Sequence, residues 1–354
     1  MKKQKSNSIG RLSSYDFDLP SELIAQKPES KRDAARLMII NKTTGEMAHR
    51  RFFDLPEILE KGDVLVFNDS KVIPARLIGK KETGGKMEVF LLTSLKHKNK
   101  KTLKQYSRVN IWRCLIKGKI KPGQKIYFTK KIFAAPIEKI DEKVWLVEFN
   151  ASDKKLFSLG ETPLPPYIKN KSRLSDYQTV YAKELGSVAA PTAGLHFTKA
   201  LISKLKKKGV QIEYVTLHVG LGTFLPVETD DILKHKMHSE LAEINPATAK
   251  KLNQAKKSGR RIIAVGTTAA RTLESCAEKK GLIRAQKIDT EIFIYPGYKF
   301  KFVAGMITNF HLPKSTLLML VSALAGKPLI DRAYKEAIKR KYRFYSFGDG
   351  MLII

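Results

Sequence analysis

Cysteines and long apolar runs are both scarce in this chain of 354 residues. The two cysteines, Cys114 and Cys276, are too few for a disulfide framework, which favours a reducing environment. No apolar stretch reaches the roughly 18 residues that a membrane-spanning helix needs. The basic start of the chain also lacks the apolar segment of a signal peptide. These absences exclude an integral membrane protein and a disulfide-stabilised secreted domain, and we expect a cytoplasmic protein.

Acidic residues are few compared with basic ones. The chain contains 34 Asp and Glu against 66 Lys and Arg, which gives a net charge of +32 at pH 7. Such an excess favours a polyanionic partner, with nucleic acid ahead of an anionic membrane surface. The alternative is a lysine-rich solvent face that reflects genome composition, as at Lys204, Lys206 and Lys207. Charge alone does not decide between these interpretations.

Two common nucleotide-binding signatures are also missing. No Walker A sequence occurs, which excludes a P-loop nucleotidase. Gly220 and Gly222 lack the third glycine of a dinucleotide-binding fingerprint. The chain has no internal repeat, but hydrophobic residues make up 43% of it, which is enough for packed cores. Its length suggests two domains.

Short β-type runs fill residues 62–155. About six such runs alternate with Gly, Pro, Asn or Lys clusters, without an amphipathic helix among them, which predicts a small antiparallel barrel or sandwich. A polar, basic stretch at 96–108 interrupts them. We interpret it as a solvated hairpin tip, with an RNA-contacting arm as the alternative. The sequence PLPP at 163–166 marks the exit from this module.

The remaining chain alternates strands and helices. Strands are predicted at 37–40, 210–218, 261–265, 292–295 and 306–308, and helices at 198–208, 246–258, 268–279, 315–325 and 329–340. The alternation favours a mixed-sheet α/β domain with helices on its faces. Because the strand at 37–40 has no local partner, we expect this domain to comprise residues 15–61 and 156–354. A β-barrel at 62–155 then interrupts it, and a disordered basic leader occupies 1–14.

Four polar loops follow the predicted strands, where α/β sheets bind ligands. Their distinctive residues are His196, His218, the Gly266-Thr267-Thr268 turn before Arg271, and His311. The free N–H groups at the start of the helix predicted from residue 268 suit a carboxylate or phosphate, with Arg271 as a bidentate partner. An ordinary helix start with a surface arginine is the alternative. Histidines in such loops indicate proton transfer on a small polar substrate.

A possible metal site lies nearby in the sequence. His235, His238 and Glu240 have a spacing that could hold a metal ion in a hydrolase. The segment is not an HExxH motif, and Lys236 between the histidines would repel a cation. We therefore expect no metal, and interpret these side chains as hydrogen-bonded polar residues in a cleft.

Long strings throughout the chain resemble a single family. They are VAAPTAGLHFT (188–198), HVGLGTFLPV (218–227), KMHSE (236–240), AVGTTAARTLES (264–275) and the segments 16–37, 62–77, 163–168, 177–187, 292–326 and 342–353. Strings of this length have a negligible chance frequency, and they cover nearly the whole chain beyond its first residues. The sequence resembles the S-adenosylmethionine:tRNA ribosyltransferase-isomerases of queuosine biosynthesis. Ala269-Ala270, Asn170 and Gly350 depart from the usual pattern, and Asn170 puts a phosphate contact there in doubt.

The resemblance implies a fold, a reaction and its partners. The fold is a β-barrel inserted in an α/β domain, and the enzyme is a cytoplasmic monomer without a metal or redox cofactor. It transfers and isomerises the ribosyl group of S-adenosylmethionine, a co-substrate. The acceptor is the aminomethyl group of a 7-deazaguanine at the wobble position of tRNA. The products are epoxyqueuosine-tRNA, adenine and methionine.

This chemistry gives the candidate residues their roles. The sulfonium acidifies the C5′ protons of the donor, so a histidine with a pKa near 6.5 could remove one. We therefore place His196 and His218 on the proton-transfer path, with Glu240 orienting a histidine or binding the ribose diol. The predicted donor-binding residues are Thr192, Gly194, Gly220, Gly222, Gly266, Thr267, Thr268, Arg271, Asn309 and His311. Among them, the 266–268 turn and Arg271 hold the methionine carboxylate.

Three arginines stand apart in this lysine-rich chain. We expect at least one of Arg32, Arg36 and Arg76 to contact tRNA phosphate. The alternative is pairing with a local carboxylate such as Asp33. Two other classes of function remain open at this point: a tRNA-binding protein without turnover, and the metal-dependent hydrolase.

Overall fold

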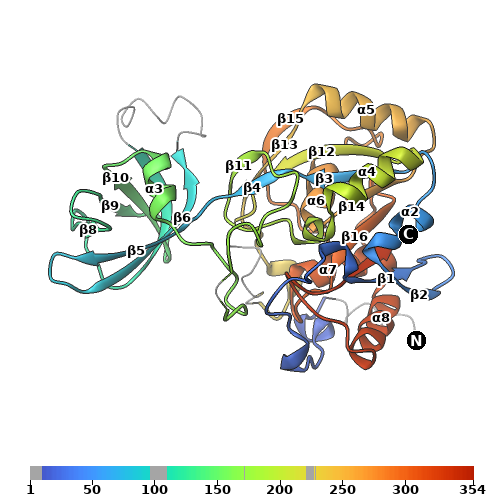
Figure 1. Cartoon of the computed structure of the whole chain (residues 1–354), viewed down its shortest axis with the longest axis horizontal. Coiled ribbons are helices and arrows are strands. Elements are labelled where there is room, and N and C mark those ends of the chain that lie inside the picture. Colours follow the sequence, from blue (N-terminus) through green and yellow to red (C-terminus); the bar gives the residue numbers. More distant parts are fainter. Residues whose placement is uncertain (1–9, 96–109, 171, 221–226, 228) are drawn as a thin grey trace.

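The computed structural model describes residues 10–95, 110–170, 172–220, 227 and 229–354. A nine-stranded mixed sheet with helices forms the larger part of the molecule, and a closed six-stranded barrel forms the smaller part (Figure 1). The expected mixed-sheet α/β fold, interrupted by a small antiparallel barrel, is confirmed. Within the described part of the chain, no helix is long and apolar enough to cross a membrane.

The large sheet combines segments from the whole sequence. In spatial order its strands are β15 (Gln286–Thr290), β13 (Glu240–Ile244), β12 (Gln211–Leu217), β3 (Val64–Asn68), β14 (Ile262–Val265), β16 (Gly305–Asn309), β17 (Gly350–Ile353), β1 (Arg36–Ile40) and β2 (Met47–Arg51). The central strands β12, β3, β14 and β16 run parallel, and antiparallel pairs form both edges. The carboxyl ends of the central strands therefore meet at one edge.

Helices bury both faces of this sheet. In β3, Val64 and Val66 join the core on one face, whereas Leu65 and Phe67 join the core on the other. The helices of the first face are α5 (Pro246–Lys257), α6 (Thr267–Cys276), α7 (Thr316–Ala325) and α8 (Lys327–Lys339). Those of the second face are α4 (Lys199–Lys208) and the short α2 (Leu55–Ile58). The sequence of a strand that is covered on both faces is a nearly continuous apolar run, and β3 has such a sequence.

The barrel is built from strands that are consecutive in sequence. They are β5 (Arg76–Lys81), β6 (Lys86–Ser94), β7 (Asn110–Lys117), β8 (Ile126–Tyr127), β9 (Phe133–Lys139) and β10 (Val144–Phe149), with α3 (Asp153–Leu159) after them. The chain enters and leaves the barrel side by side, because Arg76 and Glu161 form an antiparallel bridge. A Cβ added at Gly160 would lie 1.9 Å from the carbonyl oxygen of Pro74, so only glycine fits at this crossing.

Short elements complete the fold. They are β4 (Ser70–Val72), β11 (Glu184–Ser187) and the 3-10 helices η1 (Leu12–Tyr15), η2 (Ser21–Leu23), η3 (Arg32–Ala34), η4 (Phe52–Asp54), η6 (Thr192–His196) and η8 (Ile232–Lys234). β4 and β11 pair in parallel as a separate two-stranded sheet.

Three sequence-based expectations differ from the structure. The barrel begins at Arg76 and not at residue 62, because residues 64–68 form β3 at the centre of the large sheet. The predicted leader at 1–14 is too long, since Leu12 and Tyr15 are buried in the core and residues 1–9 lie outside the described residues. The strand predicted at 292–295 is irregular, and the edge strand lies at 286–290 instead. The basic stretch 96–108 also lies outside the described residues.

Candidate active site

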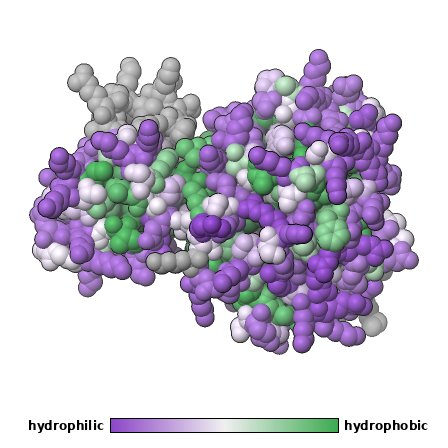
Figure 2. Space-filling view, viewed as in Figure 1, coloured by the Kyte–Doolittle hydropathy of each residue, from purple (hydrophilic) through white to green (hydrophobic). Residues whose placement is uncertain are grey.

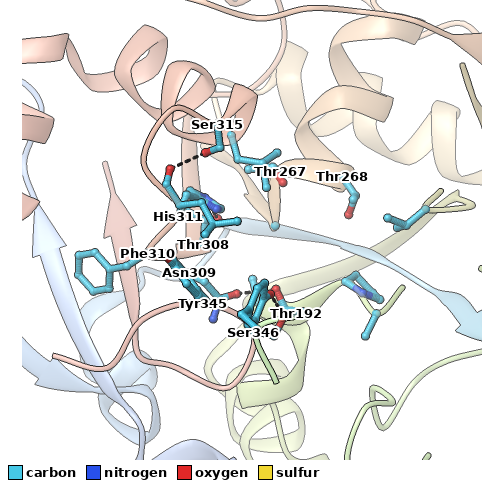
Figure 3. Close-up of a pocket in the computed structure, with 18 residues that line it drawn as sticks. Thr192, Thr267, Thr268, Thr308, Asn309, Phe310, His311, Ser315, Tyr345 and Ser346 are labelled. Carbon is cyan, nitrogen blue, oxygen red and sulfur yellow. Dashed lines mark hydrogen bonds between the residues drawn. The ribbon is translucent and has the colours of Figure 1, made fainter. Parts of the chain in front are cut away.

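A cavity opens where the carboxyl ends of β14 and β16 meet (Figure 3). Its walls are the start of α6 with Gly266, Thr267 and Thr268, the segment 308–312 after β16, and the segment 190–193 that leads into η6. The first N–H groups of α6 have no partner within the helix, so the positive end of the helix lies at the cavity.

Asn309 connects three parts of the cavity wall. The hydroxyl of Thr192 donates a hydrogen bond of 2.8 Å to Asn309 Oδ1. The Asn309 Nδ2 amide donates to His196 Nε2 at 3.2 Å and to the carbonyl oxygen of Asp349 at 3.5 Å. These contacts fix the carboxamide of Asn309 and leave the η6 segment attached to the end of β16.

The two buried histidines near the cavity are neutral at physiological pH. Burial lowers the pKa of His311 to about 3. Burial, followed by the charge of Arg343, lowers the pKa of His196 to about 3 as well. The Nε2 atom of His311 lies 2.9 Å from the hydroxyl oxygen of Thr308, and its backbone N–H donates to Tyr334 at 2.8 Å. Both imidazoles can thus serve as neutral hydrogen-bond partners.

The described residues that line the cavity are neutral. They are mainly hydroxyl-bearing and aromatic side chains: Tyr167, Thr192, Thr267, Thr268, Thr308, Phe310, Ser315, Tyr345 and Ser346. Neutral hydroxyl groups suit a sugar and a heterocyclic base, and aromatic faces attract a cation. The lining therefore offers hydroxyl groups and aromatic faces to a polar ligand.

A tyrosine pair closes one side of the cavity. The rings of Tyr167 and Tyr345 lie 4.8 Å apart between centroids, and the Tyr167 hydroxyl forms a hydrogen bond of 2.6 Å with the hydroxyl of Ser346. Burial raises the pKa of Tyr167 to about 12, so its hydroxyl stays protonated. Tyr345 has a φ of 70°, a strained conformation for a bulky residue. Such strain at a cavity wall is typical of functional sites.

A buried ion pair lies behind the start of α6. Arg271 Nη1 donates to a carboxylate oxygen of Glu240, and both side chains are only 4% exposed. The other carboxylate oxygen of Glu240 accepts a bond of 2.9 Å from the N–H of Gly220. The Nε and Nη2 atoms of Arg271 have no hydrogen-bond partner within the described part of the chain. The pair fixes α6 against the beginning of β13.

Comparisons with known proteins identify the family. The family model described as "Queuosine biosynthesis protein" matches residues 12–353. The chain belongs to this family. It is 50% identical over 347 residues to the S-adenosylmethionine:tRNA ribosyltransferase-isomerase of Thermosipho melanesiensis, which covers 97% of this chain and 99% of the relative.

Other relatives agree with this queuosine biosynthesis family. The chain is 51% identical over 352 residues to the Desulfitobacterium hafniense protein of the same name, covering 97% of this chain and 100% of the relative. It also matches a crystal structure of the S-adenosylmethionine tRNA ribosyltransferase from Thermotoga maritima with a TM-score of 0.54 at 38% identity. That match covers 96% of this chain and 100% of the other. The resemblance seen in the sequence is confirmed.

The cavity brings together many of the residues that we predicted to bind the donor of this family. Those that line it are Thr192, Gly266, Thr267, Thr268, Asn309 and His311. Gly194 instead packs under Tyr181, whose hydroxyl oxygen would lie 1.9 Å from an added Cβ. Gly220 binds Glu240 through its backbone, and Gly222 lies outside the described residues. Arg271 is held by Glu240 and is not among the described residues that line the cavity.

The predicted catalytic residues of the family site do not meet at the cavity. His196 is 5% exposed and stacks on Phe52 with ring centroids 4.1 Å apart, so it reaches the cavity only through Asn309. His218 is half-buried beside Gly186, where an added Cβ would lie 3.0 Å from its Nδ1 atom. Glu240 is engaged with Arg271. Their catalytic roles therefore stay predictions.

Contacts within the protein occupy the three arginines predicted to bind tRNA. Arg32 donates to the carbonyl oxygens of Gln178 at 2.8 Å and Ser175 at 2.6 Å. Arg36 donates to the carbonyl oxygen of Arg340 at 2.8 Å, and its guanidinium lies 3.7 Å from the ring centroid of Tyr342.

Arg76 forms two hydrogen bonds of 3.0 Å with Glu88 and lies 3.8 Å from Glu161. The contacts of Arg76 fit the alternative of pairing with a local carboxylate, whereas Asp33 accepts a bond from Thr198. A tRNA contact by any of the three arginines stays a prediction.

The expected absence of a metal stays a prediction. Among the described residues, no group of three or more His, Cys, Asp and Glu side chains could hold a metal ion. In the motif that suggested a metal, His235 packs against Phe293 with ring centroids 5.5 Å apart, and Glu240 belongs to the ion pair with Arg271.

Sequence reasoning gave no role to several residues of the cavity, although Thr308 and Ser315 flank the loop of His311 that it identified. The residues without a predicted role are Tyr167, Thr308, Ser315, Tyr345 and Ser346. Each lies in a string that carried the family resemblance, but a tyrosine or serine in a loop has no spacing signature of its own. Only the fold brings the 163–168 and 342–353 segments to the end of β16.

Proposed function

We propose that this queuosine biosynthesis protein transfers the ribosyl group of S-adenosylmethionine to tRNA and isomerises it there. The acceptor is 7-aminomethyl-7-deazaguanine at the wobble position, and the products are epoxyqueuosine-tRNA, adenine and methionine. The observation that carries this proposal is the match along nearly the whole chain to relatives that bear this activity in their names. The enzyme acts as a cytoplasmic monomer and needs no metal.

The lining of the cavity offers groups that match parts of the donor, although its volume of about 60 Å³ in this structure is smaller than a whole donor molecule. The ribose and adenine have hydrogen-bonding groups that match Thr192, Thr308 and Asn309 in the wall. The sulfonium is a cation that the faces of Tyr167 and Tyr345 would stabilise. Excluding water around the sulfonium also strengthens its electrostatic contacts, because the local dielectric constant is low.

The start of α6 is the natural site for the methionine carboxylate. Its free N–H groups and positive dipole end lie at the cavity, as in anion sites of other helices. Glu240 compensates the charge of Arg271, so the pair adds little net positive charge at the cavity. We therefore assign the carboxylate to the backbone at Gly266–Thr268, and assign to Arg271 the role of positioning α6.

His311 is the histidine that lines the cavity, so it is our candidate for the group that meets the C5′ proton. A pKa of about 3, lowered by burial, makes it a weak base. The imidazolium that forms on proton transfer is stabilised by the hydroxyl of Thr308 only if that oxygen accepts a hydrogen bond. His196 acts indirectly by fixing the amide of Asn309.

Release of adenine tests the proposed function. The purified protein is incubated with S-adenosylmethionine and tRNA that carries the 7-deazaguanine precursor, and free adenine is measured. We expect adenine only when this tRNA is present, with or without a chelator. Tight tRNA binding without adenine release would instead indicate a binding protein, and activity abolished by chelators would indicate a metal-dependent enzyme.

A further inference from the structure

A groove larger than the cavity lies between the barrel and the larger part of the molecule. Figure 2 shows a hollow between these two parts. The groove has a volume of about 1190 Å³, which exceeds the ~300–1,000 Å³ of ordinary small-molecule pockets. Barrel strands β6, β7, β9 and β10 form one side, and residues of the segment 160–170 together with Ser172 form the other. Its size fits a segment of a polymer.

The lining of the groove is positively charged. Its exposed lysines are Lys117, Lys119, Lys139, Lys143 and Lys169. Of the acidic residues that line it, Glu88 and Glu161 already face Arg76. Among the described residues, neither Lys117 nor Lys169 forms an ion pair or a hydrogen bond through its side chain. The groove therefore favours a polyanion.

Two partly exposed aromatic rings accompany these lysines. Phe90 on β6 and Trp145 on β10 line the groove and are half-buried. The other tryptophan, Trp112, is 3% exposed and donates to Asn110 at 3.2 Å inside the barrel. Aromatic faces beside a basic groove are typical of surfaces that bind single-stranded nucleic acid, because unpaired bases can stack on them. A duplex offers no such base faces.

The groove and the cavity share one wall. In the segment 164–169, Tyr167 lines the cavity, whereas Leu164, Ile168 and Lys169 line the groove. A polymer that lies in the groove therefore passes beside the wall of the cavity. The arrangement places a binding surface for a strand next to the site that the proposed function assigns to the reaction.

We propose that the groove binds the unpaired nucleotides of an RNA loop. Their bases stack on Phe90 and Trp145, and their phosphates contact Lys117 and Lys169. This inference rests on the proposed function, because the loop is the one whose modified nucleotide reacts in the cavity. It also assigns RNA contacts to residues other than Arg32, Arg36 and Arg76, which the protein itself engages.

The charge contribution can be tested with a matched pair of variants. The double variant Lys117→Ala with Lys169→Ala is compared with Lys204→Ala and Lys207→Ala, two exposed lysines on α4. Binding of an RNA hairpin with the anticodon loop is measured across a salt series. A plot of log association constant against log salt concentration has a negative slope, and each single-strand phosphate contact contributes ~0.7 to its magnitude. We expect the groove variant to reduce that magnitude by about 1.4. Equal slopes for the two variants would overturn the proposal.

Stacking has its own spectroscopic test. The chain has two tryptophans, so hairpin binding should quench the emission of Trp145, and Trp145→Phe should abolish that change. Trp145→Phe keeps a ring and should bind nearly as wild type, whereas Trp145→Ala should bind about 5- to 150-fold more weakly. Thermal melting checks that both variants are folded. Equal affinity of these two folded variants would refute stacking on Trp145.

A blunt RNA duplex of equal length separates loop binding from stem binding. We expect the groove variants and wild type to bind the duplex alike, and equal weakening for duplex and hairpin would reject loop recognition. The proposed function fails independently of this inference. Wild type that binds the hairpin through the groove but releases no adenine with the precursor-carrying tRNA rejects the function alone. Adenine release together with unaffected hairpin binding by the groove variants rejects the groove alone.

Discussion

Some residues at the cavity are placed to contact a ligand, whereas others keep the wall of the cavity in position. His311 lines the cavity, whereas His196 contacts it through the amide of Asn309. Because the two imidazoles share a similar burial and a similar lowered pKa, their roles differ through position alone. Variants of the two histidines should therefore affect different kinetic parameters.

We expect His311→Gln to lower kcat by about 10²- to 10⁴-fold, the usual contribution of a positioned acid or base. The KM for S-adenosylmethionine should change little, because glutamine retains a polar side chain. In contrast, His196→Gln should raise this KM and retain more than a tenth of the wild-type kcat. Steady-state kinetics of adenine release measures both parameters. The opposite pattern would make His196 the proton-transfer group.

Burial of neutral histidines also makes stability depend on pH. The pKa of His196 is about 3 in the folded protein and near 6.5 in the unfolded chain, so below pH 6.5 the unfolded state binds the additional proton. The free energy of unfolding therefore decreases as the pH is lowered. For this group the decrease is about 1.4 kcal/mol per pH unit between pH 6 and pH 4. We expect urea unfolding of His196→Gln to show a slope smaller by that amount.

Phe52→Leu is the control for this experiment. It removes the ring that stacks on His196 but keeps the imidazole, so it should lower stability without changing the pH slope. If His196→Gln and Phe52→Leu show the same slope as wild type, the pKa of His196 is not lowered in the folded state.

The ion pair behind α6 gives a third prediction at this scale. Arg271→Ala leaves the carboxylate of Glu240 buried without its cation, which should cost about 3–5 kcal/mol of stability. Adding Glu240→Gln removes the uncompensated charge, so the double variant should be more stable than Arg271→Ala. Chemical denaturation compares them. A double variant that is no more stable than the single one would contradict this interpretation of the pair.

At the scale of elements, the 3-10 helix η6 shows how a predicted ligand-binding residue can be a packing residue. An added Cβ at Gly194 would lie 1.9 Å from the hydroxyl oxygen of Tyr181, which is buried and interacts with the side chain of Thr179. The glycine thus allows the backbone of η6 to approach Tyr181 closely.

Gly194→Ala should therefore lower the melting temperature markedly. Tyr181→Phe removes the clashing oxygen at the cost of its interaction with Thr179, which is no more than the about 0.5–1.5 kcal/mol of one hydrogen bond. We expect the double variant Gly194→Ala with Tyr181→Phe to recover part of the lost stability. If Gly194→Ala instead keeps its stability and loses affinity for S-adenosylmethionine, Gly194 contacts the donor as the sequence suggested.

Elements with local signals were predictable from the sequence. Helices α4 and α5 begin at capping residues, Thr198 and Asn245, whose side chains accept bonds from the first turn. The place of β3 was not predictable, because its partners β12 and β14 are remote in sequence and its apolar run suits a strand of either sheet. Long-range pairing and not composition decides such cases.

The candidate site shows the same contrast between features with a local sequence signal and features that depend on long-range packing. The turn at Gly266–Thr268 was identified because a strand, a glycine turn and a helix start are local features. The pairing of Arg271 with Glu240 and the stacking of His196 on Phe52 depend on how distant elements pack, which no residue spacing reveals. Residue type therefore identified the loops of the cavity better than it assigned roles within them.

At the scale of the whole molecule, the chain enters the barrel at Arg76 and leaves it at Glu161, and these two points lie side by side. The barrel is therefore an insertion that can be removed from the chain. These two residues form an antiparallel bridge, and the N–H of Glu161 donates to the carbonyl oxygen of Arg76 at 2.8 Å. A two-residue Asn-Gly turn can join such a pair directly. Removal would expose Ile73 and Val188, which pack against the barrel core.

We expect a chain in which Asn-Gly replaces residues 77–160 to unfold cooperatively, at a lower temperature than the full chain because Ile73 and Val188 become exposed. It should still bind S-adenosylmethionine, since the described residues of the cavity all lie outside the barrel. It should lose most of its affinity for the RNA hairpin. Calorimetry measures all three properties, and absence of a cooperative transition would show that the barrel is required for folding.

The parallel pairing of β1 with β17 has a consequence for biosynthesis. The backbone N–H of Arg36 binds the carboxylate of Asp349, which lies 313 positions further along the chain. On the ribosome, the barrel strands emerge in succession and can pair with one another early, whereas β1 lacks this neighbour until residues 350–353 have been made. Until then, β1 pairs with β2 on one side and stays unpaired on the other, so we expect the nascent chain to depend on chaperones to prevent wrong pairing at Leu37 and Met38.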